Sequence, residues 1–167
     1  VTELKTLLEV DKLPMYRDGI IEQVSSWDPT GGNEDGFAGK YSYIRKENGN
    51  LVLADLKGPG VVNRIWTPTP TRDTLLFYFD GEKKPRLKIC FEDLFNGKVE
   101  PFVRPLCANE VGGFYCYLPF TYEKSLKIVF TGDLIQFHQI QYRNLEGKSV
   151  ETYTPEITEE IGGLVKD

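Results

Sequence analysis

Apolar and polar side chains alternate through most of this chain with a period of two residues, which is the pattern of a half-buried β-strand. The clearest runs are "LLFYF" from Leu75, "LKICF" from Leu87 and "LKIVF" from Leu126. Successive side chains on a strand point to opposite faces, so each run presents one apolar face. These faces predict strands packed over a shared core, which would be formed by Leu75, Phe77, Phe79, Leu87, Ile89, Phe91, Leu126, Ile128 and Phe130.

Turn signals such as "ENGN", "KGPG", "FDGEKKP" and "TGD" separate these runs. Helical character is limited to "TELKTLLEV" near the start, with Thr2 as a candidate N-cap, and to "TPEITEEI" near the end. The pattern predicts strands at 19–25, 40–46, 50–56, 61–67, 74–80, 86–92, 112–118, 125–131 and 134–143. Short strands without intervening helices indicate an antiparallel sandwich or barrel.

Two connections indicate how these strands are joined. Asp80 and Gly81 lie at the tip of a link between two strongly alternating strands, which is a hairpin signal. A longer connection, 93–113, contains "EDLFNG" and several prolines, and its length suits the crossover of a jelly roll. The predicted fold class is therefore all-β, an antiparallel two-sheet jelly-roll sandwich of about eight strands with a short N-terminal helix.

Length, charge and hydropathy exclude several classes of protein. The 167 residues suffice for one domain with its own core, so folding requires neither a disulfide nor a metal. The net charge of -5 gives no broad basic surface, so nucleic acid is not an expected partner. No apolar stretch approaches the ~20 residues of a membrane helix, so no membrane partner is expected either.

The three cysteines predict neither a zinc site nor a disulfide framework. Cys90, Cys107 and Cys116 have no CxxC spacing, and three thiols cannot all pair with one another. They are interpreted as mostly packed thiols, with Cys90 on the less buried face of its strand.

The segment "SSWDPTGGNEDGF", residues 25–37, is unusually rich in functional groups. Asp28, Asn33, Glu34 and Asp35 supply oxygen ligands of the kind that calcium prefers, near glycines that allow tight turns. The spacing is not that of an EF-hand, and the alternative is that Asp28, before Pro29, and Asn33 form Asx turns that cap backbone amides. No metal ligand and no cofactor are assigned from this segment.

The same loop also has the residue mix of a sugar subsite. Trp27 offers an aromatic face for C–H groups, while Asp28, Asn33 and Asp35 offer acids and an amide for hydroxyls. The alternative is a core tryptophan at a strand end. Arg64 and Trp66, two residues apart, share one face of a predicted strand, where they would bind a ligand or stack on each other.

His138 is the only histidine of the chain and shares a strand face with Gln136, Ile140 and Tyr142. Without an accompanying serine or cysteine motif it is interpreted as a structural histidine. The sequence also lacks GxSxG, a phosphate loop and HExxH, which removes three further classes of enzyme.

Four segments in order resemble the N-terminal half of domain-of-unknown-function family 2961, which is glycoside hydrolase family 172. They are "QVSSWDPTGGNEDGFAGKYSYIR", "LADLKGPGVVNRIWTPTPT", "LLFYFDGEKKPRLKI" with "FEDLF", and "YCYLPFTYEKSLKIVF". The resemblance runs from about Met15 to Tyr142 and makes the loop at 25–37 a hallmark of the family.

The resemblance implies one half of a bacterial double jelly-roll protein that assembles as trimers or hexamers. Such proteins cleave furanosides, including difructose dianhydrides and arabinofuranosides, by a retaining mechanism that uses two carboxyl groups about 5 Å apart. In the family these are two glutamates of the second jelly roll, near a "GTGTEDYF"-like segment that this sequence lacks. No residue of this chain is therefore assigned as catalytic, and the chain alone is expected to be inactive.

From the resemblance we expect a lead-in at 1–18, a jelly roll at 19–145 and a tail at 146–167 that leads toward a second jelly roll. Together with a first residue that is not methionine, it also implies an extracellular or periplasmic location after removal of a secretory signal. The two alternatives to an enzyme half are a non-catalytic carbohydrate-binding module and a structural or oligomerisation domain. The predicted substrate-binding residues are Trp27, Asp28, Asn33, Asp35, Arg64 and Trp66.

Overall fold

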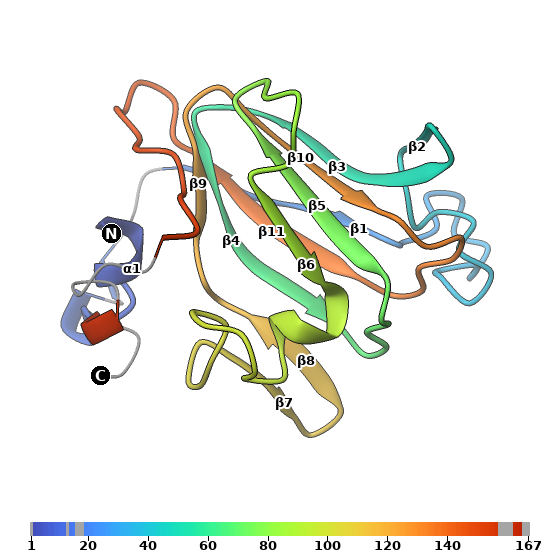
Figure 1. Cartoon of the computed structure of the whole chain (residues 1–167), viewed down its shortest axis with the longest axis horizontal. Helices are drawn as coiled ribbons and strands as arrows, with labels where there is room; N and C mark the ends of the chain where they lie inside the picture. Colours follow the sequence, from blue (N-terminus) through green and yellow to red (C-terminus); the bar gives the residue numbers. More distant parts are fainter. Residues whose placement is uncertain (1, 13, 16–18, 157–161, 165–167) are drawn as a thin grey trace.

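The computed structural model describes residues 2–12, 14–15, 19–156 and 162–164 as two antiparallel sheets packed face to face (Figure 1). The first sheet contains β1 (Ile21–Ser25), β4 (Gly60–Thr67), β7 (Cys107–Glu110), β8 (Gly113–Cys116), β9 (Phe120–Tyr122) and β11 (Gln139–Asn144). The second contains β2 (Arg45–Glu47), β3 (Asn50–Lys57), β5 (Thr74–Phe79), β6 (Leu87–Cys90) and β10 (Ser125–Phe130). The predicted all-β sandwich is confirmed.

The strand order is that of a jelly roll. The first sheet runs β1-β11-β4-β8-β7 and the second β2-β3-β10-β5-β6. Both β8 and β9 pair with β4, and Pro119 lies between them, so together they act as one interrupted strand. Eight strands remain if β2 and β7 are set aside as additions at the sheet edges and β8 and β9 are counted as one strand. Numbered 1 to 8 in chain order, these strands lie as 1-8-3-6 in the first sheet and as 2-7-4-5 in the second, which is the arrangement of two Greek keys.

Two strand predictions and one connection require correction. The predicted strand 40–46 is present only from Arg45, because the chain from Gly36 to Ser42 bonds to itself in consecutive turns: the Gly39 amide donates to the Gly36 carbonyl and the Ser42 amide to that of Gly39. The predicted strand 134–143 begins only at Gln139. The connection 93–113 contains a strand that was not predicted, β7, and its first two residues are the end of a 3₁₀ turn, η2 (Phe91–Leu94).

The helical predictions are only partly met. The N-terminal helix α1 (Thr2–Lys5) is a single turn, and a second short turn, η1 (Val10–Lys12), follows it. The predicted helix in "TPEITEEI" falls mainly on residues outside those described. No helix within the described ranges is long and apolar enough to cross a membrane.

The core lies between the two sheets and contains the apolar faces expected from the alternation. All nine residues named for these faces are at most 8% exposed. Aromatic rings from both sheets meet at Phe120, which stacks on Phe77 of β5 and also contacts Tyr153. Tyr153 comes from the segment after β11, so that segment contributes to the core; the division of the chain at residues 18 and 145 stays a prediction.

Figure 1 shows which segments lie at the two ends of the sandwich. The helix α1 lies at one end of the sandwich, and the long connection from β1 to β2, residues 26–44, lies at the opposite end. The loop singled out in the sequence is therefore at the end of the sandwich away from α1.

Candidate functional site

Three strand ends of the first sheet meet under the loop that follows β1. In the ladder, Ser25 lies opposite Gln139 and Gln139 lies opposite Trp66, so the end of β1, the start of β11 and the end of β4 form one row. The next residue across is Tyr115 of β8. This row, Ser25-Gln139-Trp66-Tyr115, presents its side chains on the outer face of the sheet. Ile65 and Ile140, which are next to Trp66 and Gln139 along their strands, point to the opposite face and are buried in the core.

A second row lies two residues further along the same face. It consists of Gln23, Gln141 and Arg64. The guanidinium of Arg64 donates to Oε1 of Gln139 at 2.8 Å and lies over the ring of Trp66, 5.8 Å from its centroid. Stacking of Arg64 on Trp66, one of the two alternatives for this pair, is thus present, and Arg64 also bonds to a side-chain amide.

The loop 26–37 is held together by Asp28, which is 4% exposed. Its carboxylate accepts hydrogen bonds from the Thr30 amide at 2.8 Å, the Thr30 hydroxyl at 2.6 Å and the Glu34 amide at 3.1 Å. The hydrogen bond from the Thr30 hydroxyl is the main cause that lowers the pKa of Asp28 below its ordinary value. Asp28 therefore shapes the loop from within, in the way of an Asx turn.

The end of the loop is anchored on the residues that precede β11. Gly36 has a φ of +143°, and a Cβ there would lie 3.0 Å from the ring of Phe137, so only glycine allows this approach without strain. The ring of Phe37 meets that of Phe137 edge-on at 4.8 Å, and Gln136 donates to the Phe37 carbonyl at 3.2 Å. These contacts fix the position of Asp35, whose carboxylate accepts from the Asp28 amide.

A cavity of about 230 Å³ opens where this loop meets the outer face of the sheet. Trp27, which is 61% exposed, and Asp35 line it from the loop, and Trp66 lines it from β4. Its remaining lining residues are Gln23, Ser25, Ser26, Phe137, His138 and Gln139. Two indole rings, side-chain amides, hydroxyls and one carboxylate therefore converge on one hollow.

His138 is one of the lining residues of this cavity and is only 2% exposed. Its Nε2 is 2.8 Å from the Ser42 carbonyl, so this nitrogen carries the proton and donates. Its backbone is tied to Ser26 by the Ser26 amide and the Ser26 hydroxyl. Burial lowers the pKa of His138, which keeps the ring neutral and agrees with a structural role.

Because His138 is the only histidine, its titration should be visible in the stability of the chain. Above the ordinary pKa of 6.5 neither the folded nor the unfolded state is protonated. Below it the unfolded state binds a proton that the folded state resists, so the free energy of unfolding should fall as the pH drops. Urea unfolding at a series of pH values from about 8 to about 5.5 measures this decline.

The matched variant is His138→Gln, whose amide nitrogen takes the place of Nε2 and retains a donor for the Ser42 carbonyl. The carboxyl groups of both proteins titrate alike, so the difference between the two curves isolates the histidine. Parallel curves across this range would contradict the assignment of a neutral, buried His138.

The structure brings some of the predicted site residues together and separates others. Trp27, Asp35 and Trp66 line the cavity, and Arg64 reaches it through Gln139. Asp28 is occupied within the loop, and Asn33 is an exposed turn residue with a φ of +60° that does not line the cavity. Within the described ranges, no group of three or more His, Cys, Asp or Glu side chains could hold a metal ion.

Sequence reasoning overlooked the polar side chains of β1 and β11. Gln23, Ser25 and Gln139 line the cavity, and Gln141 extends the same face. The signal was present in "HQIQYR", where two glutamines alternate with Ile140, although only the register with β4 places them beside Trp66.

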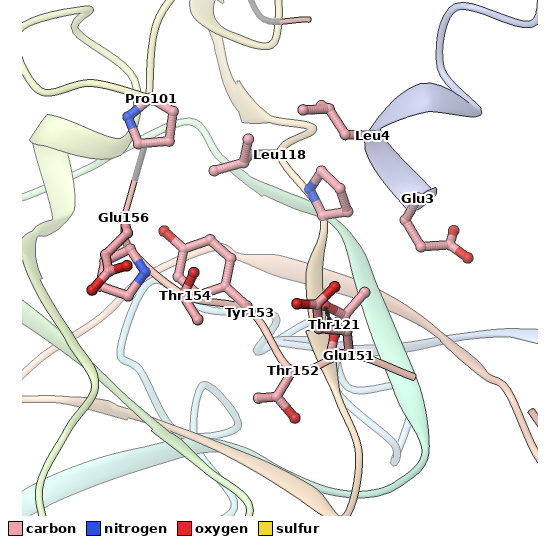
Figure 2. Close-up of a pocket in the computed structure, with 12 residues that line it drawn as sticks. Glu3, Leu4, Pro101, Leu118, Thr121, Glu151, Thr152, Tyr153, Thr154 and Glu156 are labelled. Atoms are coloured by element: carbon pink, nitrogen blue, oxygen red, sulfur yellow. Dashed lines mark hydrogen bonds between the residues drawn. The ribbon is translucent and has the colours of Figure 1, made fainter. Parts of the chain in front are cut away.

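A second cavity, of about 130 Å³, lies near the other end of the sandwich between α1 and residues 151–156 (Figure 2). Leu4 and Leu118 line it, and Glu3 on its edge is paired with Arg143 at 2.7 Å. Among the described residues that line it, Tyr153 alone is aromatic, and that ring is stacked on Phe79 at 5.6 Å and meets Phe120. Because these residues offer no open aromatic face, this cavity is a poorer candidate for ligand recognition than the hollow beside Trp27.

A family model described as the GH172 first beta-sandwich domain matches residues 18–161, which is most of the chain. No curated protein matches the chain.

Proposed function

The chain belongs to glycoside hydrolase family 172 as a first β-sandwich domain, and on this premise we propose that it forms one wall of the sugar site of a furanoside-cleaving enzyme. The proposed substrates are difructose dianhydrides or arabinofuranosides, and the proposed role is carbohydrate degradation. The proposal includes an extracellular or periplasmic location and assembly as a trimer or hexamer.

The cavity between Trp27 and Trp66 is the observation that carries this proposal. A furanose ring has C–H groups on its faces and hydroxyls around its edge, so it is recognised by aromatic faces together with amides and acids. Trp27 supplies an open aromatic face, while Gln139 and Asp35 supply an amide and a carboxylate at the wall of the same hollow. Arg64 orients Gln139 and covers part of Trp66, which prearranges the polar side of the site.

Catalysis is proposed to require a second β-sandwich domain. A retaining glycosidase needs a nucleophilic carboxylate and an acid–base carboxyl group about 5 Å apart. The loop carboxylates nearest the cavity already have partners: Asp28 binds loop amides, Glu34 is paired with Lys40, and Asp35 accepts from the Asp28 amide. These groups bind or shape the site, and the two catalytic glutamates are assigned to the second sandwich.

The binding role predicts a specific loss in the Trp27→Ala variant. Removal of the exposed indole should weaken binding of a difructose dianhydride or an arabinofuranoside by about tenfold or more, since it removes one stacking face. Titration calorimetry, together with the tryptophan fluorescence of the parent protein, measures the change in affinity.

Tyr117→Ala is the matched control, because Tyr117 is an aromatic residue that is 42% exposed and does not line the cavity. It should bind the sugar as the parent does. Equal affinity of the parent and the Trp27→Ala variant would refute a role for this cavity in sugar binding.

A second candidate function is a carbohydrate-binding module without catalysis, which the exposed face of Trp27 within this one chain favours. The two candidates differ in what the complete protein does. A binding module retains the sugar unchanged when any second domain is supplied, whereas an enzyme half then yields cleaved product. A purely structural or oligomerisation domain responds to sugar in neither test.

A further inference from the structure

Cys107 and Cys116 lie directly opposite each other in the hairpin formed by β7 and β8. The turn of this hairpin consists of Val111 and Gly112, both with positive φ, which is the type I′ geometry of a two-residue loop. In such a hairpin the residues next to the turn form a hydrogen-bonded pair, and the two kinds of pair then alternate along the ladder. The pair Cys107–Cys116 is the fourth from the turn and is therefore a non-hydrogen-bonded pair.

The backbone contacts agree with this register. The Tyr117 amide donates to the Leu106 carbonyl at 2.8 Å, which is the ladder bond expected one residue beyond a non-hydrogen-bonded pair. The Cys107 amide donates to the Val103 carbonyl at 2.9 Å and not across the hairpin.

A non-hydrogen-bonded pair brings its Cα atoms to about 4.5 Å, which lies within the 4.4–6.8 Å range of disulfides. The two side chains point into the core, with exposures of 1% and 0%. Burial raises the pKa of Cys116, and a hydrogen bond with the Cys107 side chain raises it further. The two sulfur atoms are therefore neighbours in the core.

We propose that Cys107 and Cys116 are a site of covalent modification, at which a cross-strand disulfide forms when the chain folds in the presence of a small-molecule disulfide such as oxidised glutathione. Cys90 is excluded from this bond, because it lies on β6 of the other sheet with its thiol directed at the Thr71 and Arg72 carbonyls.

The reaction consists of two thiol–disulfide exchanges. The Cys107 thiolate attacks one sulfur of oxidised glutathione, forms a mixed disulfide and releases one molecule of glutathione. The Cys116 thiolate then attacks the Cys107 sulfur, forms the protein disulfide and releases the second. Each protein thiol gives up one proton, each released glutathione thiol gains one, and the two electrons reduce the glutathione disulfide.

Burial determines when this reaction takes place. The attacking species is the thiolate, and both thiols of the folded chain are shielded from solvent. Exchange is therefore expected during folding, while the hairpin is still open, and to be slow once the core has closed.

The bond would stabilise the neighbourhood of the candidate site. It would join the edge strand β7 to β8, and β8 pairs with β4 at Trp66. Gly113 of the same hairpin touches this indole so closely that a Cβ would lie 2.9 Å from its Nε1. A fixed hairpin therefore holds the side of Trp66 that faces away from β11.

The test is refolding of the whole chain from denaturant, with or without a mixture of reduced and oxidised glutathione. Each product is then denatured and its free thiols are alkylated. We expect three alkylated cysteines without glutathione and one, Cys90, with it. Peptide mapping should show Cys107 joined to Cys116, and the midpoint of thermal unfolding should rise by about 5 °C.

The variants Cys90→Ser and Cys116→Ser separate the proposal from nonspecific oxidation. Cys90→Ser should still lose both of its remaining thiols on oxidative refolding, whereas Cys116→Ser should form no intramolecular bond. Three free thiols in the oxidatively refolded parent, a bond to Cys90, or glutathione retained on Cys107 would each overturn the proposal. Peptide mapping of the parent decides the question even where a variant fails to fold.

Discussion

Replacing Phe120 with alanine is expected to lower the free energy of unfolding by about 3–5 kcal/mol, the range for truncation of a buried phenylalanine. Phe120 is fully buried and joins the two sheets, since it lies on β9 and stacks on Phe77 of β5 at 5.0 Å. Its ring also lies 6.2 Å from that of Phe102 and 5.1 Å from that of Tyr153. Three rings would lose their common neighbour. Equilibrium unfolding in urea measures the loss.

Phe37→Ala provides the matched control, because it removes the same atoms from an exposed site. Among the described residues its ring has one aromatic partner, Phe137, so the expected loss is at most about 1 kcal/mol. Similar losses in the two variants would mean that Phe120 does not join the sheets in the way described.

The fold could be predicted from the sequence because the alternation of apolar residues is a local signal. In "LLFYF" and "LKIVF" the alternation indicates which face of the strand is buried, and turn residues indicate where the strand ends. Where that signal is weak the prediction failed. "CANE" of β7 has no alternation, and its pairing with β8 depends on a partner strand and a turn at Val111 and Gly112.

The candidate site was only partly predictable, because it depends on the register between strands far apart in the sequence. Trp27 and Trp66 are conspicuous in the sequence, but Gln139 becomes part of the site only because β11 lies between β1 and β4. The loop carboxylates show a second limit. Composition cannot show whether an acid faces a ligand or its own backbone, and Asp28 binds its own loop.

Hydrolysis of a furanoside is expected only when this chain is combined with a second β-sandwich domain of the family, linked to it or added separately. The chain alone should act at least about 10⁴-fold more slowly than the combination, because a retaining site without its nucleophile and its acid–base group loses most of its rate enhancement. Release of product from an arabinofuranoside or a difructose dianhydride, followed over time, measures the difference.

The variant Asp35→Asn makes this prediction specific. Asparagine retains an oxygen that can accept from the Asp28 amide, as the Asp35 carboxylate does, so the loop should persist while the charge at the cavity is lost. If both catalytic carboxyl groups belong to the second sandwich, the variant should weaken sugar binding and leave a measurable turnover. Steady turnover by this chain alone, abolished in Asp35→Asn, would instead place a catalytic carboxylate in the first sandwich. The wall that we assign to binding would then itself contain the reacting group.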